Sequence, residues 1–250
     1  MKKLLIATAL ATIAGAASAQ DIVRLGTEGA YPPYNFINDA GEVAGFEREF
    51  GDELCKRAGL TCEWVTNEWD SIIPNLQSGN YDVIIAGMSI TDEREEVIDF
   101  SAGYLPPASS SYLALSAETD LMSGPVAAQT GTIQASFIAE NGMQLVEYAT
   151  PEETVAAVKN GEAVAVLADK DYLVPMANES GGELVLLAKE ESIGGGVGLG
   201  FRDSDDALRE KFDAAIKSMK CDGTLDTMIT KAEYFGPESK TWGDAGKEGC

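Results

Sequence analysis

Two short runs that read as buried strands, at residues 81–86 and 163–168, constrain the fold of this chain more than any other feature. The second run is Ala-Val-Ala-Val-Leu-Ala, without a polar residue, as is typical of a parallel strand that is covered on both faces. The first run leads into a turn of small residues and then into a helix start. Strand-to-helix units of this kind predict an α/β fold.

Further strand and helix patterns continue this arrangement along the chain. We expect strands at residues 22–27, 61–65, 82–86, 112–115, 126–128, 145–148 and 163–168. We expect helices from Gly45 to Gly59, at 71–77 behind the cap residue Asp70, before 141, from 150 to 160, from Ser204, and at 224–231.

Aromatic residues near two expected loops have more than one interpretation. The segment 28–36 contains two prolines and a glycine, which predicts an irregular, exposed loop that carries Glu28, Tyr31 and Tyr34. Tyr34 is expected to pack, whereas Tyr31 either packs or offers a flat face to a ligand. Trp69 is either a core residue or an exposed platform, and composition alone favours the core because large aromatic residues are more often buried.

Two segments rich in helix- and strand-breaking residues, at 101–111 and 194–200, divide the pattern. The glycines of the second segment run into a strand and are therefore not a nucleotide-binding fingerprint. The simplest arrangement is two α/β lobes joined by two linker strands. Residues 20–105 and 200–250 would form lobe one and residues 106–199 lobe two, with a hinge that closes around a ligand.

The start of the helix after residue 90 contains an unusually placed cation. Thr91 can cap this helix, but Arg94 lies in its first turn, where a positive charge opposes the helix dipole. One interpretation is a surface ion pair with a neighbour such as Glu95, which contributes little. The other is that Arg94 binds an anionic ligand group beside the backbone N–H groups of Gly87 and Ser89.

Other polar residues occupy comparable positions in the chain. Ser89, Arg94, Thr132 and Asp169 all follow directly after expected strands, and ligands of open α/β sheets bind beyond the carboxyl ends of the strands. Thr132 begins a helix whose free N–H groups suit an anion, although an ordinary strand-to-helix turn is commoner. Asp169 has the alternative role of capping the segment 172–177.

The first residues resemble a secretory signal. Lys2 and Lys3 precede an apolar run at residues 4–13, and Ala17-Ser18-Ala19 forms a small-residue cleavage site. The apolar run is too short for a membrane anchor. We expect cleavage after Ala19 and an exported, soluble protein without a later membrane-spanning segment.

Charge and composition exclude several classes of function. The formal net charge of −23 makes nucleic acid and anionic lipid unsuitable partners. The chain has no histidine, which excludes Ser-His-Asp and Cys-His catalysis and ordinary zinc enzyme sites. Carboxylate, lysine or tyrosine chemistry stays possible, but the expectation is a protein with no catalytic residues, no metal and no cofactor.

The four cysteines predict two disulfides, because exported proteins form them readily. Cys55 and Cys62 are local partners across a helix end and the next strand. Cys221 and Cys250 would then pair and attach the C-terminal tail to the last helices. Metal binding is the alternative, but these spacings match no zinc motif.

Taken together, these residues resemble the polar amino-acid solute-binding proteins of bacterial ABC importers over nearly the whole mature chain. The similarity is greatest to binders of lysine, arginine, ornithine and histidine, with glutamine and opine binders nearby. Its most specific parts are Gly-Phe-Glu-Arg-Glu-Phe at 45–50, Trp-Asp-Ser-Ile-Ile-Pro at 69–74 and Ala-Gly-Met-Ser-Ile-Thr-Asp-Glu-Arg at 86–94. The Cys55–Cys62 pair is similar to the local disulfide of the basic amino-acid binders.

The resemblance implies a two-lobed, type II periplasmic binding protein fold and a set of ligand contacts. Arg94 and Ser89 would hold the ligand α-carboxylate, with N–H groups from Thr132 and Ile133. Asp169 and the Gly87 carbonyl would accept from the α-ammonium. Tyr31 and Trp69 would enclose the side chain, and Glu28 would reach its distal nitrogen.

The resemblance also implies a periplasmic monomer that hands a polar L-amino acid to a membrane permease. Cationic amino acids are the first choice because Glu28 supplies a charge and the two aromatic residues suit a cationic stem. The sequence departs from the basic binders at Ala86 and Gly87, which replace hydroxyl side chains, and at Ile133. Alternatives are an exported dehydratase for a prephenate-like substrate, with Glu28 or Asp169 as the acid, and a soluble sensor domain.

Overall fold

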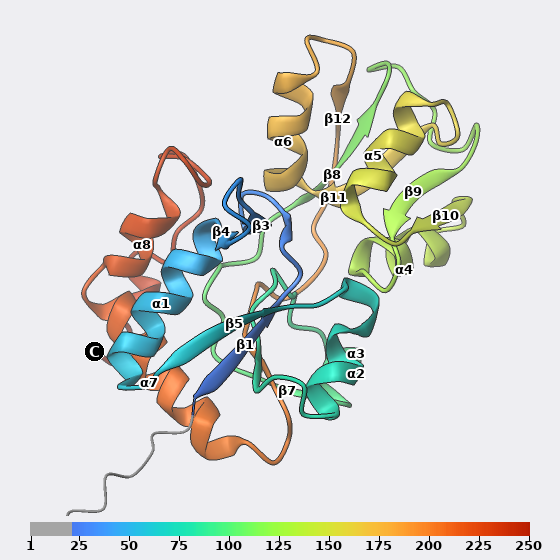
Figure 1. Cartoon of the computed structure of the whole chain (residues 1–250). Coiled ribbons are helices and arrows are strands. Elements are labelled where there is room, and N and C mark those ends of the chain that lie inside the picture. Colours follow the sequence, from blue (N-terminus) through green and yellow to red (C-terminus); the bar gives the residue numbers. More distant parts are fainter. Residues whose placement is uncertain (1–21) are drawn as a thin grey trace, which may run out of the picture.

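Two five-stranded sheets, each covered by helices, form two lobes in the computed structural model, which describes residues 22–250 (Figure 1). The predicted signal segment 1–19 and its cleavage site after Ala19 lie outside the described residues. The first sheet has the order β5 (Cys62–Thr66), β1 (Val23–Thr27), β6 (Val83–Ile84), β13 (Gly200–Phe201) and β7 (Asp99–Phe100). The second has the order β10 (Leu145–Tyr148), β9 (Val126–Gln129), β11 (Ala165–Asp169), β8 (Ser110–Ala114) and β12 (Val185–Glu191).

The helices follow the strands in the alternating order that the sequence predicts. They are α1 (Phe46–Ala58), α2 (Ile72–Gln77), α3 (Asp92–Glu95), α4 (Ile133–Glu140), α5 (Pro151–Lys159), α6 (Lys170–Glu179), α7 (Asp206–Cys221) and α8 (Thr224–Ile229). Short 3₁₀ helices lie at Trp69–Ser71 and Ala245–Lys247. The predicted α/β fold class is confirmed.

Both sheets mix parallel and antiparallel strands. β1 runs parallel to β5 and β6, while β13 is antiparallel to β6 and β7. β11, which contains most of the apolar run 163–168, is parallel to β9 but antiparallel to β8. The prediction of a parallel strand is therefore correct for only one of its two neighbours.

Each sheet is buried on both faces, which explains the apolar runs. In the first lobe, Val83 and Ile85 pack toward Phe46 and Phe50 of α1, whereas the alternate residue Ile84 lies in a second cluster under α2. Side chains alternate between the faces of a strand, so both faces need apolar residues. In the second lobe, α4 covers one face, and α5 and α6 cover the other.

Helix α1 shows how the sequence specifies these elements. Phe46, Phe50 and Leu54 recur at fourfold spacing, point to the core and are buried. The helix ends where predicted, at Gly59, whose left-handed conformation (φ 67°) suits glycine. Burying each such side chain contributes on the order of 2 kcal/mol.

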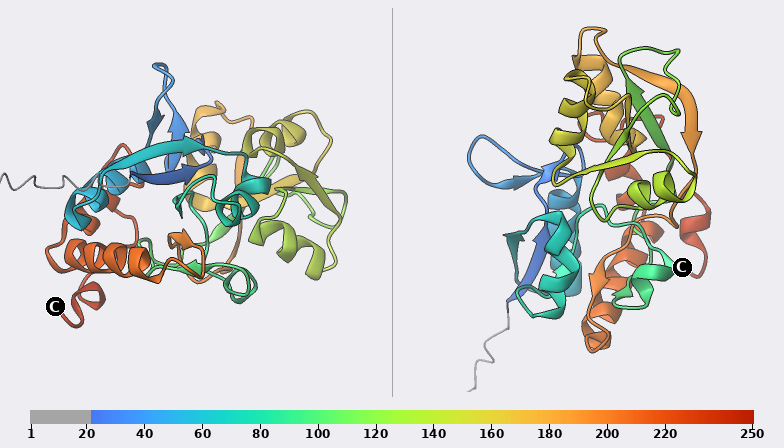
Figure 2. Two further views of the ribbon diagram at one scale, coloured as in Figure 1. Left: turned by 60° about the horizontal axis from the view of Figure 1, so that its bottom comes forward. Right: turned by 90° about the vertical axis from the view of Figure 1, so that its right-hand side faces the viewer.

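Two connections, at residues 101–109 and 192–199, join the lobes and lie side by side. Leu105 and Val197 form an antiparallel bridge, and Val197 N donates to the Leu105 carbonyl at 3.0 Å. In both views of Figure 2 the second lobe, coloured from green through yellow to light orange, lies toward one end of the molecule, and the blue and red parts of the first lobe lie toward the other. The boundaries of the lobes at residues 105/106 and 199/200 stay a prediction.

Several local predictions are wrong. The segment 28–36 is not entirely irregular, because β2 (Ala30–Tyr31) and β3 (Asn35–Ile37) form a small sheet with β4 (Val43–Ala44). Asp70 lies inside the 3₁₀ helix, and Ser71 precedes α2 without a side-chain cap bond. The last long helix begins at Asp206 after Asp205, not at Ser204. No described helix has the length and apolar character needed to cross a membrane.

Both predicted disulfides are present. The S–S distances are 1.96 Å for Cys55–Cys62 and 1.93 Å for Cys221–Cys250. The second disulfide ties the C-terminal tail to α7. The tail also contacts the first connection between the lobes, because the Trp242 indole N–H donates to the Tyr104 carbonyl at 2.9 Å.

We expect the double variant Cys221→Ser, Cys250→Ser to lose thermal stability. The bridge closes 29 residues of chain, and removing such a constraint costs about 3 to 4 kcal/mol in the chain-entropy account. For a chain of this size the melting temperature should fall by about 10 °C. Scanning calorimetry of both proteins checks this, and an unchanged melting temperature would show that noncovalent contacts of the tail suffice.

Candidate functional site

A pocket between the lobes collects every residue that the sequence predicts to bind a ligand. It is lined by Glu28, Tyr31, Trp69, Gly87, Ser89, Arg94, Thr132, Ile133 and Asp169. Three further residues, Ala86, Gln129 and Gln134, complete the lining and were not predicted as site residues. The two glutamines could have been suspected, because they flank the turn 130–133 directly after a buried apolar strand.

Arg94 lies at one end of this pocket on the short helix α3. The helix begins as predicted, because the Thr91 hydroxyl accepts from Arg94 N at 3.2 Å. The guanidinium donates to the Ser89 carbonyl at 2.8 Å and to the Gly131 carbonyl at 3.3 Å, and it lies 5.4 Å from the centre of the Trp69 ring. Within residues 22–250 it forms no ion pair, so the interpretation as a surface ion pair is wrong.

This environment leaves a cation without an anionic partner. Burial lowers the pKa of Arg94 to about 10, against the attraction of Glu93 and Asp169. A half-buried cation is costly unless an anion compensates it. The guanidinium fork therefore suits a carboxylate ligand that binds through two hydrogen bonds.

Asp169 faces the cleft although it precedes helix α6. It occupies the cap position without a side-chain cap bond, so the predicted alternative role as a cap is wrong. Its carboxylate instead accepts from the Tyr31 hydroxyl at 2.9 Å and from Gln134 Nε2 at 3.2 Å. Burial raises the pKa of Asp169 to about 6, while the bond from Tyr31 opposes the shift. The carboxylate is available to an ammonium group.

Glu28 approaches the pocket from the end of β1. Its Oε1 accepts from Gln129 Nε2 at 2.6 Å, so a hydrogen bond joins the residue after β1 of the first sheet to the last residue of β9 in the second. Burial raises the pKa of Glu28 to about 7, and the bond from Gln129 is the main opposing effect. Glu28 and Asp169 give the pocket two acidic groups besides the single guanidinium.

The two aromatic residues line the pocket in different ways. The Tyr31 ring stacks on Tyr172 of α6 with a centroid distance of 4.4 Å, so the packing and pocket roles of Tyr31 coexist. Trp69 is only half-buried and lies under Arg94, so the preference for a core position from composition alone is wrong. Tyr34 is buried, as predicted.

Backbone groups of two turns complete the site. Gly87 has a φ of 62°, which favours glycine. Its N–H donates to the buried Glu47 carboxylate at 2.6 Å, so the prediction that this N–H faces an anionic ligand group is wrong. Thr132 caps α4, and its hydroxyl accepts from Ala135 N at 3.2 Å. The first N–H groups of α4, beginning at Ile133, have no partner within a helix and suit an anion.

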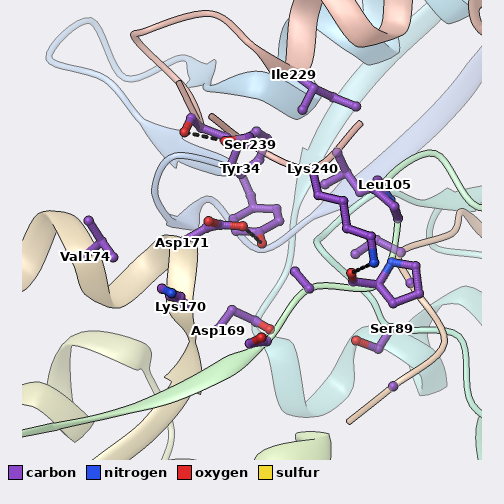
Figure 3. A pocket seen from close by; sticks show the side chains of 18 of the residues that line it. Tyr34, Ser89, Leu105, Asp169, Lys170, Asp171, Val174, Ile229, Ser239 and Lys240 are labelled. Atoms are coloured by element: carbon purple, nitrogen blue, oxygen red, sulfur yellow. Dashed lines mark hydrogen bonds between the residues drawn. The ribbon is translucent and has the colours of Figure 1, made fainter. Parts of the chain in front are cut away.

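A second cavity of about 690 Å³ adjoins the pocket on the side of the connections between the lobes (Figure 3). Ser89 and Asp169 line both spaces. On its far wall Lys240 of the C-terminal tail donates to the Pro107 carbonyl at 3.0 Å. The tail thus reaches the first connection between the lobes.

In the part of the chain that the structure describes, no cluster of acidic or cysteine side chains is arranged to hold a metal ion. The ligand-facing groups of the pocket are one guanidinium, two carboxylates and two aromatic rings. This set complements a small zwitterion with an additional positive charge.

Comparison with known proteins identifies the family. Residues 23–237 match the sequence model of the bacterial extracellular solute-binding proteins, family 3. The chain belongs to this family. The predicted family is confirmed, and this solute-binding protein has the two-lobed fold of its relatives.

Similar proteins cover almost the whole of this solute-binding protein. A periplasmic His/Glu/Gln/Arg/opine family-binding protein from Silicibacter pomeroyi, solved in complex with lysine, is 70% identical with a TM-score of 0.86, covering 88% of this chain and 99% of that chain. The histidine-binding periplasmic protein of Escherichia coli (strain K12) is 32% identical over 260 residues, covering 94% of this chain and 97% of the relative. The lysine/arginine/ornithine-binding periplasmic protein of the same strain is 30% identical over 256 residues, with the same coverage. Each is described as a binding protein rather than an enzyme.

Proposed function

We propose that this protein captures a cationic L-amino acid, L-lysine first, between its lobes and delivers it to the membrane permease of an ABC importer. The observation that carries the proposal is the charge pattern of the pocket, in which Arg94 forms no ion pair with any residue from 22 to 250 and lies near the buried carboxylates Asp169 and Glu28. The lysine in the 70% identical relative supports it. We further propose a monomer that acts in the periplasm after cleavage behind Ala19.

Each charged group of the ligand has a partner in this arrangement. The α-carboxylate binds Arg94, with Ser89 and the N–H groups at Thr132 and Ile133. The α-ammonium donates to Asp169 and to the Gly87 carbonyl. The side chain passes between Tyr31 and Trp69, and its distal cation meets Glu28. Arginine, ornithine and histidine share this charge pattern, and glutamine and opines share its α-carboxylate.

Hydrogen bonds across the cleft support a hinge mechanism. Gln129 donates to Glu28, Tyr31 donates to Asp169, and the Arg94 guanidinium donates to the Gly131 carbonyl. These partners belong to different lobes, so the bonds form only when the lobes are close. Such bonds stabilise the closed form that encloses a ligand.

Calorimetric titration of the ligand-free protein with the standard amino acids and ornithine tests the proposal. We expect the tightest binding for lysine, arginine or ornithine, and weaker or absent binding for acidic and aliphatic amino acids. Purified protein must first be freed of any carried ligand by unfolding and refolding. Binding of none of lysine, arginine, ornithine, histidine or glutamine would refute the proposed ligand class.

The dehydratase alternative makes an opposite prediction. Its substrate lacks an α-ammonium, whereas Asp169 beside Arg94 complements an α-amino acid. An assay with prephenate should therefore release no phenylpyruvate. Release above the rate without protein would favour the enzyme.

A further inference from the structure

The side chain of Gln129 has a fixed orientation that the sequence does not reveal. Gln129 is the last residue of β9 and is buried, with 8% of its surface exposed. Its Nε2 donates to two acceptors, Glu28 Oε1 at 2.6 Å and the Ala149 carbonyl at 3.1 Å. Because only the NH₂ end of the amide can donate, these two acceptors determine which end faces Glu28.

The same contact leaves one of the two Glu28 carboxylate oxygens, Oε2, free to accept a hydrogen bond from a ligand in the pocket. Oε1 accepts from Gln129, and no other residue between 22 and 250 donates a hydrogen bond to either oxygen. Glu28 lines the pocket with Oε2 unpaired. A carboxylate oxygen held in this way is a single, directed acceptor for one cationic group.

We propose that Gln129 is a specificity-determining residue, whose amide holds the Glu28 carboxylate across the cleft as a charged acceptor for the distal cation of the ligand. The pocket then selects a cationic ligand over a neutral one of equal length. This inference rests on the proposed function, but it concerns a residue that positions Glu28 and was not among the predicted ligand contacts.

The surroundings of Glu28 show why it depends on this amide. Burial is the main cause that disfavours the charged form of Glu28, and repulsion from Glu68 and Glu47 adds to it. Gln129 is the one hydrogen-bond donor among the described residues that stabilises the charged form. Removing the amide should therefore raise the pKa of Glu28 further above about 7.

The experiment compares Gln129→Leu, which keeps the side-chain volume but cannot donate, with the unmodified protein. The probes are L-lysine and L-6-hydroxynorleucine, a lysine isostere with a hydroxyl in place of the distal ammonium. At pH 7 we expect lysine to bind about tenfold more weakly, as for loss of a hydrogen bond to a charged group, and the isostere to change less than about twofold. The pH midpoint of lysine affinity should move upward by about one unit.

Glu28→Gln provides the matched background. In that variant the carboxylate is absent, so adding Gln129→Leu should change neither the lysine affinity nor its pH profile further. The inference would be overturned if Gln129→Leu weakened the binding of lysine and of the isostere equally and left the pH midpoint of lysine affinity unchanged. That result would show that Gln129 only supports the shape of the pocket.

A measurement without ligand separates this inference from the proposed function. Carboxyl ¹³C titration of the ligand-free protein should show a higher pKa for Glu28 in Gln129→Leu than in the unmodified chain. An unchanged pKa would overturn the inference even if lysine binds. Failure of the unmodified protein to bind any of lysine, arginine, ornithine, histidine and glutamine would refute the proposed function alone. If Gln129→Leu does not fold, Gln129→Asn, whose shorter amide cannot reach both acceptors, undergoes the same tests.

Discussion

Replacing Arg94 with alanine should weaken the binding of every amino acid by about a hundredfold to several thousandfold. The guanidinium is the only cation that lines the described pocket, and the α-carboxylate is common to all candidate ligands. Removing one partner of a buried charge pair costs about 3 to 5 kcal/mol, because the other charge is left uncompensated. Calorimetric titration with lysine, arginine and glutamine measures the loss, which should be similar for all three.

Two variants make the result specific to the guanidinium of Arg94. Arg94→Lys keeps the charge but not the two-pronged geometry, and should recover part of the affinity. Arg48→Ala is the matched control, because Arg48 forms an exposed ion pair with Asp52 on α1 and does not line the pocket. It should bind lysine normally. Near-native affinity of Arg94→Ala, with a native circular dichroism spectrum, would contradict the proposed role.

The position of Arg94 shows how far local sequence rules reach. The cap residue Thr91 and the strand before it place Ser89 and Arg94 at a carboxyl end of the first sheet. The same rule places Thr132 and Asp169 at the second sheet. The α/β pattern and the two connections between the lobes were enough to predict that these four residues converge. For Glu28, Tyr31 and Trp69 the sequence pattern alone did not decide whether they bind a ligand, and the family resemblance supplied that prediction.

Contacts between distant residues were not predictable in this way. Gln129 and Glu28 are 101 positions apart, and nothing near either residue indicates the other. The same holds for Asp169, whose local sequence suggests a helix cap but whose side chain binds Tyr31, 138 positions away. Local propensity is a weak guide where a tertiary hydrogen bond competes with it.

Elements that are specified by residues close in sequence were predicted well. Elements that depend on pairing with other strands were predicted less well. The helix start at Thr150 and the glycine that ends α1 are confirmed, because each depends on residues close in sequence, as in the capping box that Thr150 forms with Glu153. The short strands β2 and β3 were missed, because each gains its stability from pairing in a small sheet rather than from a pattern of its own.

Lysine affinity should fall by up to about a thousandfold between pH 8 and pH 5. Burial raises the pKa of Glu28 to about 7 and that of Asp169 to about 6, so both carboxylates gain protons in this range. If only the ionised groups bind the ligand cations, the loss at pH 5 is about a hundredfold from Glu28 and about tenfold from Asp169. Titration calorimetry at several pH values gives the profile.

The sign of the effect on stability is opposite in the ligand-free protein. The folded state holds protons on both groups up to a higher pH than the unfolded chain, whose carboxyls titrate near 4. Between about pH 4 and pH 7 the folded state therefore binds more protons, and rising pH lowers the free energy of unfolding. Bound lysine removes this penalty, so its stabilising effect in thermal unfolding should be larger at pH 8 than at pH 5.

A second ligand, glutamine, and one variant separate the contributions of Glu28 and Asp169 to the pH profile. Glutamine has no distal cation and should lose only about tenfold by pH 5, through Asp169. Glu28→Gln should weaken lysine binding at pH 8. It should also remove the step in lysine affinity near pH 7 and leave the step near pH 6. A lysine profile that stays flat from pH 8 to pH 5 would show that neither carboxylate binds the ligand. A step near pH 7 in Glu28→Gln equal to that of the unmodified protein would assign that proton to a group other than Glu28.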